Sequence, residues 1–356
     1  MSLLTSPCST ARRALLLAGL GAAFETRALP AKALTFPRDY GSHPDFRTEW
    51  WYVTGHAKAG QREFGFQVTF FRSRVDGTQG MTSKFAAKQL VFAHAAVTDV
   101  QGKKLLHDQR IAREGFELAT ADATDTHVRL GDWSLKREAS GYRAQVAGGD
   151  FKLALALTPS QPVLLQGDKG LSRKGPEAKQ ASYYYSEPQL AAEGVITLNG
   201  ADMAVRGTAW LDHEWSQELL HPLAVGWDWI GMNLFDGSAL TAFQLRDKQG
   251  KALWDGGSFR VKGGSVHRFS PGEVIFSRQR SWKSQPSQAT YPVEWIVRTP
   301  ADFYTVKSVI DNQELDSRPS TGAMYWEGLS DLFDSNGKHV GRGYLEMTGY
   351  ASRLRI

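Results

Sequence analysis

The sequence is almost without cysteine, since Cys8 is the only one among 356 residues. A single thiol cannot form an intramolecular disulfide, and it cannot supply the thiolate ligands of a structural zinc site. Stability must therefore come from the burial of apolar side chains. The length allows a large core, and the hydrophobic content of 42% and charged content of 22% are those of globular proteins.

The signatures of several common functional classes are also missing. There is no run rich in lysine and arginine, which argues against nucleic-acid binding. There is no G-x-S-x-G elbow of an α/β-hydrolase, no phosphate-binding loop and no dinucleotide fingerprint. The nine histidines show no close H-x-x-x-H spacing, so we predict no metal site.

The N-terminal segment, residues 1–33, has the features of a signal peptide. Arg12 and Arg13 precede an apolar run over residues 14–24, and the sequence AKA at 31–33 is typical of a cleavage site. The paired arginines suit a twin-arginine export signal. We predict a periplasmic or secreted protein; the alternative is a disordered tail. The apolar run is too short to span a bilayer, so we expect no integral membrane protein.

Removal of this segment would also change the charge of the protein. Residues 1–33 hold four basic side chains and one acidic side chain, so they account for most of the formal net charge of +5. The mature protein would be close to neutral, which again gives no support to a nucleic-acid partner.

The rest of the chain shows the alternation of apolar and polar residues that is typical of half-buried strands. In one segment Phe64, Phe66, Val68 and Phe70 share a face, and residues 90–96 and 151–157 repeat the pattern. Asn-Gly and Asp-Gly turn signals separate these runs, and helix-forming stretches are scarce. We therefore predict an all-β fold.

The two halves of the chain resemble each other, which predicts two copies of one β unit. Trp51 and Gly55 match Trp227 and Gly231 at an offset of 176 positions. Residues 207–212 match residues 341–346 at an offset of 134, so Asp212 falls on Glu346. We place the units at residues 34–218 and 219–356. A strand meander of this size closes best as an up-and-down barrel, because closure removes exposed edges.

The strongest candidate for chemistry is the segment from Trp210 to Trp215. Alternation places Trp210, Asp212 and Glu214 on one face of a strand, with His213 on the other. One interpretation is an acid in an apolar, aromatic site, where desolvation raises its pKa and keeps it protonated as a proton donor. The other is a structural ion pair or hydrogen bond at the junction of the two units.

Further candidates are aromatic, and each has a structural alternative. Trp51 is expected to fill the closed end of the first barrel, and Glu49 beside it to pair with Arg72 or Arg206. Three other groups could line a ligand site or simply fill a core; these are Trp227 with Trp229, the tyrosines of the Ser182–Ser186 segment including Tyr183 and Tyr185, and the strand residue His94.

These segments together resemble the AttH-like family of lipocalin-like proteins, a group that includes the carotenoid 1,2-hydratases. The matching stretches are residues 43–55, 66–72, 92–94, 184–186, 207–215, 226–231 and 325–328. The resemblance implies two tandem lipocalin-like barrels packed together, with an apolar ligand, an isoprenoid or a lipid, in a cavity near their junction.

The resemblance also implies a chemistry. In the hydratases an aspartate protonates an isolated carbon–carbon double bond, and here it corresponds to Asp212, with Trp210, Tyr183 and Tyr185 as neighbours. The hydratases carry a histidine in this group of neighbours, whereas positions 183 and 185 hold tyrosines. Aromatic faces would stabilise the cation, and Glu214 or His213 would guide the water.

Two functions remain open at this point. The first is a hydratase-like enzyme that requires no metal or other cofactor. The second is a non-enzymatic carrier or chaperone for a lipid, serving an envelope ABC transporter.

Overall fold

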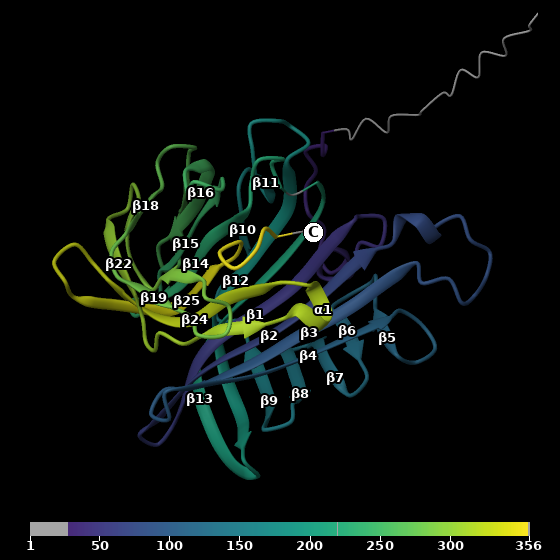
Figure 1. The fold of residues 1–356 in the computed structure, drawn as a ribbon, viewed down its shortest axis with the longest axis horizontal. Coiled ribbons are helices and arrows are strands. Elements are labelled where there is room, and N and C mark those ends of the chain that lie inside the picture. The colour runs from purple at the N-terminus through teal and green to yellow at the C-terminus, as the bar shows by residue number, and fades with distance from the viewer. Residues whose placement is uncertain (1–27, 219, 355–356) are drawn as a thin grey trace, which may run out of the picture.

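The computed structural model describes residues 28–218 and 220–354. The predicted signal peptide therefore falls largely outside the described residues. Almost all regular structure is β, in two large antiparallel sheets that lie side by side (Figure 1). The few helices are short: η1 (Arg38–Tyr40), η2 (Asp76–Thr78) and α1 (Arg318–Thr321). Among the described residues no helix has the length and apolar character needed to cross a membrane.

The first sheet has 13 strands in the order β4-β3-β2-β1-β13-β12-β9-β8-β7-β6-β5, with β10 and β11 paired to β12. The two ends of this order approach each other, since β3 and β4 come close to β6, so the sheet is nearly a closed barrel. Its strands are β1 (Thr48–Ala59), β2 (Arg62–Arg74), β3 (Gln89–Asp99), β4 (Lys104–Arg113), β5 (Ala119–Ala121), β6 (His127–Leu130), β7 (Trp133–Glu138), β8 (Gly141–Ala147), β9 (Phe151–Thr158), β10 (Leu164–Leu165), β11 (Leu171–Arg173), β12 (Ala181–Leu198) and β13 (Ala201–Glu218).

The second sheet has ten strands in the order β17-β16-β15-β14-β25-β24-β22-β21-β18, with β23 paired to β24. A separate hairpin is made by β19 and β20. The strands are β14 (Gly226–Leu234), β15 (Ala239–Arg246), β16 (Ala252–Arg260), β17 (Val266–Phe269), β18 (Ile275–Arg278), β19 (Ser281–Lys283), β20 (Thr290–Pro292), β21 (Glu294–Arg298), β22 (Phe303–Ser308), β23 (Glu314–Asp316), β24 (Met324–Phe333) and β25 (His339–Met347).

The two sheets share one connectivity, which confirms the predicted repeat of a β unit. In each sheet the first strand pairs with the last, as β1 with β13 and β14 with β25, and a run of neighbouring hairpins follows on either side. The chain passes from one sheet to the other between Glu218 and Gly226. The prediction of an all-β fold with two barrel-like units is therefore confirmed.

Alternation explains how each strand serves two environments. Phe64, Phe66, Val68 and Phe70 of β2 are all fully buried in the core of the first sheet, together with Trp51. The opposite faces of β1, β2 and β13 meet β14, β24 and β25 of the second sheet. A third apolar core fills this junction and contains Tyr52, Trp210, Trp229 and Phe243. The junction is thus built from the outward faces of both sheets.

Candidate functional site

A cavity of about 370 Å³ lies at the junction, with walls from both sheets. Most of its surface is apolar, and the large apolar side chains lining it include Phe71, Phe92, Trp227, Trp229, Phe243 and Leu245. Several carboxylic acids lie among the polar groups that line it, including Asp212, Glu214, Glu327 and Glu346. An apolar site with a small number of placed polar groups is the usual form of a small-molecule pocket.

Asp212 of β13 faces this cavity and is 3% exposed. Its Oδ1 accepts hydrogen bonds from Ser186 Oγ at 2.5 Å and Trp210 Nε1 at 2.7 Å, and its Oδ2 accepts one from Tyr184 at 2.8 Å. Burial raises the pKa of Asp212 to about 7, although these three hydrogen bonds act in the opposite direction. Near neutral pH this carboxyl therefore exists in both protonation states, as a proton donor requires.

Glu214, two residues along β13, lies on the same cavity wall but in a different electrostatic environment. Its Oε1 lies 3.0 Å from Lys174 Nζ and also accepts a hydrogen bond from Ser182. Both partners of this ion pair are buried. Two acids on one strand thus have different surroundings, because Asp212 has only neutral donors and Glu214 has a cation.

The second sheet contributes another pair of acids to the same cavity. Glu327 of β24 and Glu346 of β25 stand directly opposite each other in the strand register. Burial raises the pKa of Glu327 well above its ordinary value, and the neighbouring Glu346 raises it further. Burial also raises the pKa of Glu346 to about 7, against a hydrogen bond from the Trp227 side chain. Glu346 is only half-buried, since its carboxyl borders the cavity.

Trp229 of β14 positions the aromatic wall around these acids. Its ring meets Tyr52 edge-on at 5.4 Å and Trp210 at 6.2 Å between ring centroids. A side chain at Gly231 would collide with this ring, because an added Cβ would lie 2.2 Å from Trp229 Cη2. The absence of a side chain at Gly231 therefore lets the indole lie flat along the strand beside the cavity.

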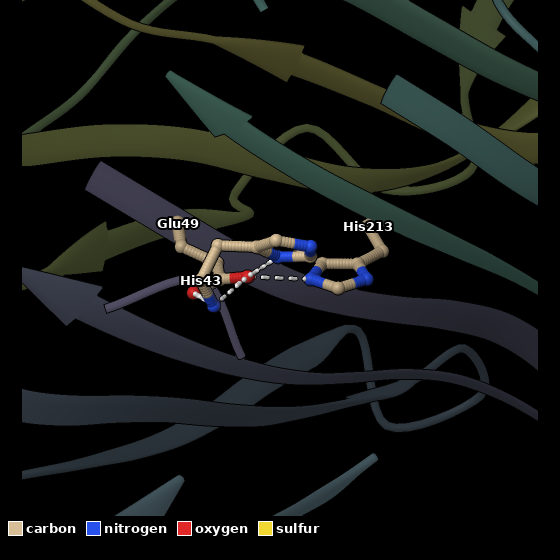
Figure 2. A group of neighbouring side chains, drawn as sticks. All are labelled: His43, Glu49 and His213. Atoms are coloured by element: carbon tan, nitrogen blue, oxygen red, sulfur yellow. Dashed lines mark hydrogen bonds and ion pairs between the residues drawn. The ribbon is translucent and has the colours of Figure 1, made fainter. Parts of the chain in front are cut away.

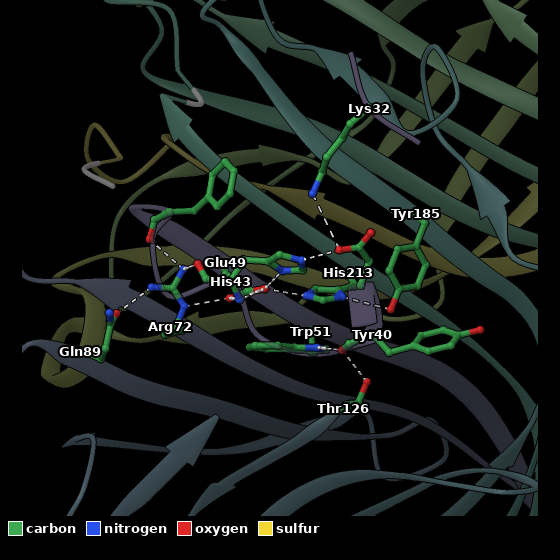
Figure 3. A network of polar contacts seen from close by, with 12 residues as sticks. Lys32, Tyr40, His43, Glu49, Trp51, Arg72, Gln89, Thr126, Tyr185 and His213 are labelled. Carbon is green, nitrogen blue, oxygen red and sulfur yellow. Dashed lines mark hydrogen bonds and ion pairs between the residues drawn. The ribbon is translucent and has the colours of Figure 1, made fainter. Parts of the chain in front are cut away.

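On the opposite face of β1 and β13, inside the first barrel, lies a buried polar network (Figures 2 and 3). Glu49 Oε1 lies 2.7 Å from His43 Nδ1 and 2.9 Å from His213 Nε2. Its Oε2 accepts a hydrogen bond from Arg72 Nε at 2.8 Å, so Arg72 is the one of the two predicted partners that pairs with Glu49. The far ring nitrogens are also engaged, by Asp39 on His43 and by the Tyr185 hydroxyl on His213.

The charges of this network follow from its contacts. Burial alone would raise the pKa of Glu49, but hydrogen bonds from His213 and His43 outweigh it and hold the pKa well below its ordinary value. Burial lowers the pKa of His213 to about 4, so its ring is neutral at pH 7. His213 stacks on Trp51 at 4.6 Å, and His43 stacks on Trp215 at 3.8 Å.

His43, Glu49 and His213 are also residues of the kind that bind a divalent cation, and their ligand atoms lie within 4.8 Å of one another. The Arg72 guanidinium on Glu49 opposes a second positive charge there, and every ligand atom already has a hydrogen-bond partner. We therefore interpret the group as a structural network that fixes β1 against β13.

The sequence-predicted site residues fall into two groups. Asp212, Glu214, Trp227, Trp229 and His94 line the cavity, and Trp210 contacts Asp212. The remaining predicted residues lie on the barrel-core face of the strands, away from the cavity; they are His213, Trp51, Tyr183 and Tyr185.

The placement of the tyrosines differs from the expectation. The register of β12 against β13 pairs Tyr185 with His213 and Tyr184 with Glu214. Tyr184 therefore shares the face of Asp212, and its neighbours Tyr183 and Tyr185 point into the barrel. His94 borders the cavity with both ring nitrogens engaged, by the Tyr325 hydroxyl at 2.8 Å and Ser320 Oγ at 2.9 Å. Burial lowers its pKa to about 3, so it is neutral.

The AttH-like family model matches residues 27–350 of the chain. The chain belongs to the AttH-like family. Among solved structures, a protein designated AttH from Nitrosomonas europaea is 49% identical, with a TM-score of 0.85, and the match covers 91% of this chain and 99% of that one. No curated protein matches the chain.

Two more distant structures share the fold of this AttH-like protein. Kievitone hydratase from Nectria haematococca is 14% identical, with a TM-score of 0.71, and the match covers 90% of this chain and 94% of that one. CghA is 12% identical, with a TM-score of 0.52, over 91% of this chain and 95% of that one. At these identities the likeness extends to the fold alone.

Sequence reasoning missed several groups at the cavity of the AttH-like protein. Tyr52, Lys174, Glu327 and Glu346 all line it. A signal for Glu346 was present, because the internal repeat aligns it with Asp212. Tyr52 and Glu327 lay within the segments that carry the family resemblance, but nothing in their local pattern distinguished a cavity-lining residue from a core residue.

Proposed function

We propose that this AttH-like protein binds an apolar ligand that contains a carbon–carbon double bond and adds water to that bond by acid catalysis. The observation that carries the proposal is the carboxyl of Asp212, which borders an apolar cavity and has a pKa of about 7. A carboxylic acid with this pKa holds a proton at neutral pH and can still release it. An isoprenoid is the ligand class that combines an apolar body with isolated alkenes.

The reaction can be written with the residues at the cavity. The Asp212 proton adds to one alkene carbon, which leaves a carbocation on the other. The aromatic faces of Trp229, Trp227 and Tyr184 stabilise that positive charge. The oxygen of a water molecule then bonds to the cation, and the proton that it loses returns to the Asp212 carboxylate. The sum is alkene plus water giving an alcohol, and Asp212 ends as it began.

The shared fold with kievitone hydratase supports the proposal, because it indicates that this architecture can house a hydratase. The same cavity also supports a second function. Its lining is mostly apolar, so a lipid could be held there without reaction. In that case the protein would be a carrier, and we propose the periplasm as its location and an envelope ABC transporter as its partner. The signal-like sequence of residues 1–33 supports export for both functions.

Asp212→Asn separates the two functions, because an amide cannot donate a proton to an alkene but preserves the size of the side chain. Extracts of the protein purified from its own host are first analysed by mass spectrometry to identify the bound molecule. For an enzyme, we expect Asp212→Asn to lose hydration of that molecule by roughly a hundredfold or more while still binding it. The matched control is Glu193→Gln, because Glu193 lies on exposed surface with 63% of its side chain accessible.

Full turnover by Asp212→Asn would rule out the acid mechanism. A carrier would show no hydration in either protein and equal ligand occupancy in both. It would instead lose occupancy when Trp227 or Trp229 is truncated to alanine, because these indoles supply apolar contact area at the cavity.

A further inference from the structure

The second sheet carries a polar group at the cavity that the hydration chemistry does not use. Glu327 is 1% exposed and lines the cavity, and its Oε2 has no hydrogen-bond partner among the described residues. Its other oxygen, Oε1, accepts a hydrogen bond from the Tyr52 hydroxyl. A buried polar atom without a partner costs free energy, and native proteins keep such atoms mainly where a ligand or water completes them.

The surroundings of Glu327 determine what kind of group could complete it. Its cross-strand neighbour is another acid, Glu346, and no lysine or arginine contributes to its electrostatic environment. Two carboxyls in direct opposition, one of them fully buried, cannot both be ionised without a large cost, so Glu327 is held as a neutral acid. Because Oε1 accepts from Tyr52, the carboxyl proton belongs on Oε2. This oxygen is therefore a donor in need of an acceptor.

The position of this donor relative to Asp212 follows from the strand register. Tyr52 stands directly opposite Asp212 across β1 and β13, and its hydroxyl reaches Glu327 in the other sheet. One tyrosine thus lies between the two acids, and the ring of Trp229 packs on it. A ligand that spans this part of the cavity meets Asp212 from one sheet and Glu327 with Glu346 from the other.

We propose that Glu327 and Glu346 form a second polar subsite that holds a hydroxyl or carbonyl oxygen of the ligand, so that the ligand is an oxygen-bearing isoprenoid and not a plain hydrocarbon. This inference rests on the proposed function, because it assumes that the apolar part of the ligand occupies the same cavity. The subsite adds a selectivity that Asp212 does not provide: it favours ligands that carry an oxygen atom away from the reacting alkene.

A pair of probes with the same carbon skeleton, one an alcohol and the other a hydrocarbon with one more double bond, tests the subsite. Farnesol is an isoprenoid alcohol, and farnesene is a hydrocarbon with the same skeleton. Binding is measured by quenching of tryptophan fluorescence, since Trp227 and Trp229 line the cavity. One hydrogen bond predicts that the protein binds farnesol roughly three- to tenfold more tightly than farnesene. In Glu327→Met we expect this ratio to fall to about one, with farnesene binding unchanged.

Two further variants serve as a control and as an alternative in case Glu327→Met does not fold. Glu193→Met is the matched control, because Glu193 occupies the position that the repeat aligns with Glu327 but lies on exposed surface. It should keep the preference for the alcohol. If Glu327→Met does not fold, the pair Tyr52→Phe with Glu327→Met removes both partners of the internal hydrogen bond and leaves no buried donor unpaired.

The outcomes separate this inference from the proposed function. Equal affinity for the two probes in the unaltered protein, or a preference that persists in the folded Glu327→Met protein, overturns the subsite but leaves the apolar cavity intact. Failure of both probes to bind overturns the ligand cavity and the subsite with it. Loss of hydration in Asp212→Asn with the alcohol preference retained supports both proposals.

Discussion

The hydroxyl of Tyr52 in the first sheet donates a hydrogen bond to the Glu327 carboxyl of the second sheet. Tyr52 is also the direct cross-strand neighbour of Asp212. Burial raises the pKa of this phenol well above its ordinary value, so it remains a donor throughout the physiological range. The contact joins the two sheets at the point where their acids meet. Residues of both sheets therefore determine the protonation of the acids that line the cavity.

The first prediction concerns the pH dependence of hydration. Asp212 must be protonated to act, and its pKa is about 7. We therefore expect kcat/KM to be highest on the acidic side and to fall tenfold per unit as the pH rises above about 7. A rate profile between pH 5 and pH 9 checks this. An activity that increases with pH through this range would mean that the ionised carboxylate is the active form.

The second prediction distinguishes Tyr184 from Tyr185. Tyr184 donates a hydrogen bond to Asp212, which favours the ionised carboxylate, whereas Tyr185 donates to His213 inside the barrel. We expect Tyr184→Phe to raise the pKa of Asp212 and move the falling limb of the rate profile to higher pH by roughly one unit.

Tyr185→Phe is the matched control for this shift, since it removes the same atom from the adjacent residue of the same strand. It should lower the stability but leave the pH profile in place. An equal displacement of the profile by both substitutions would contradict the register that we describe for β12 and β13.

The third prediction concerns stability and pH. The folded pKa of Asp212, about 7, lies above the ordinary aspartate value of 3.8, so between these values the folded protein holds a proton that the unfolded chain has lost. The stabilisation from this group is therefore complete below about pH 4 and is lost as the pH rises toward 7. In Asp212→Asn this contribution is absent.

As the pH rises, the unfolding free energy of the wild type should therefore decrease relative to that of Asp212→Asn. The steepest slope is about 1.4 kcal/mol per pH unit, between pH 4 and pH 7. Urea denaturation at several pH values measures it. Comparison with the variant is necessary, because buried neutral histidines such as His94 and His213 give a slope of the opposite sign in both proteins. A pH-independent difference would show that Asp212 has an ordinary pKa.

The fourth prediction concerns the network around Glu49. In Glu49→Gln the buried guanidinium of Arg72 loses its anionic partner, and we expect a loss of stability of about 3–5 kcal/mol. The surface pair of Glu138 with Arg143, at 2.9 Å, is the comparison, and Glu138→Gln should cost less than about 1 kcal/mol.

Metal removal tests the same network in another way. If His43, Glu49 and His213 form a hydrogen-bonded structural group, dialysis against a chelator should leave the Tm unchanged. A Tm that falls on chelation and recovers with a divalent cation would instead identify the group as a metal site.

The sequence was sufficient to predict the parts of the site that depend on strand periodicity. Alternation placed Asp212 and Glu214 on one face of β13 and His213 on the other, and both are observed. For Glu49 the sequence left two partners open, Arg72 and Arg206, and the structure pairs it with Arg72, its direct neighbour across β1 and β2.

The tyrosines were not predictable for a specific reason. Three consecutive tyrosines fit either face equally well, and the choice depends on the β12–β13 register, which shifts near residues 181–183 and 187–190. Each irregularity adds or removes one residue from the alternation, so the side chains beyond it lie on the opposite face from the one that simple alternation predicts. Likewise, Glu327 became a cavity residue only through the packing of one sheet on the other, which local periodicity does not encode.

The strands of each sheet are contiguous in the chain, and the first sheet ends at Glu218 before the second begins at Gly226. During synthesis the first sheet can therefore form while the second is still unmade. At that stage the cavity-facing side of β13, with Asp212, lacks its cover from the second sheet. Part of the burial that raises its pKa comes from the second sheet, whose Trp229 packs on Tyr184 beside it, so we expect the full rise in pKa only in the assembled protein.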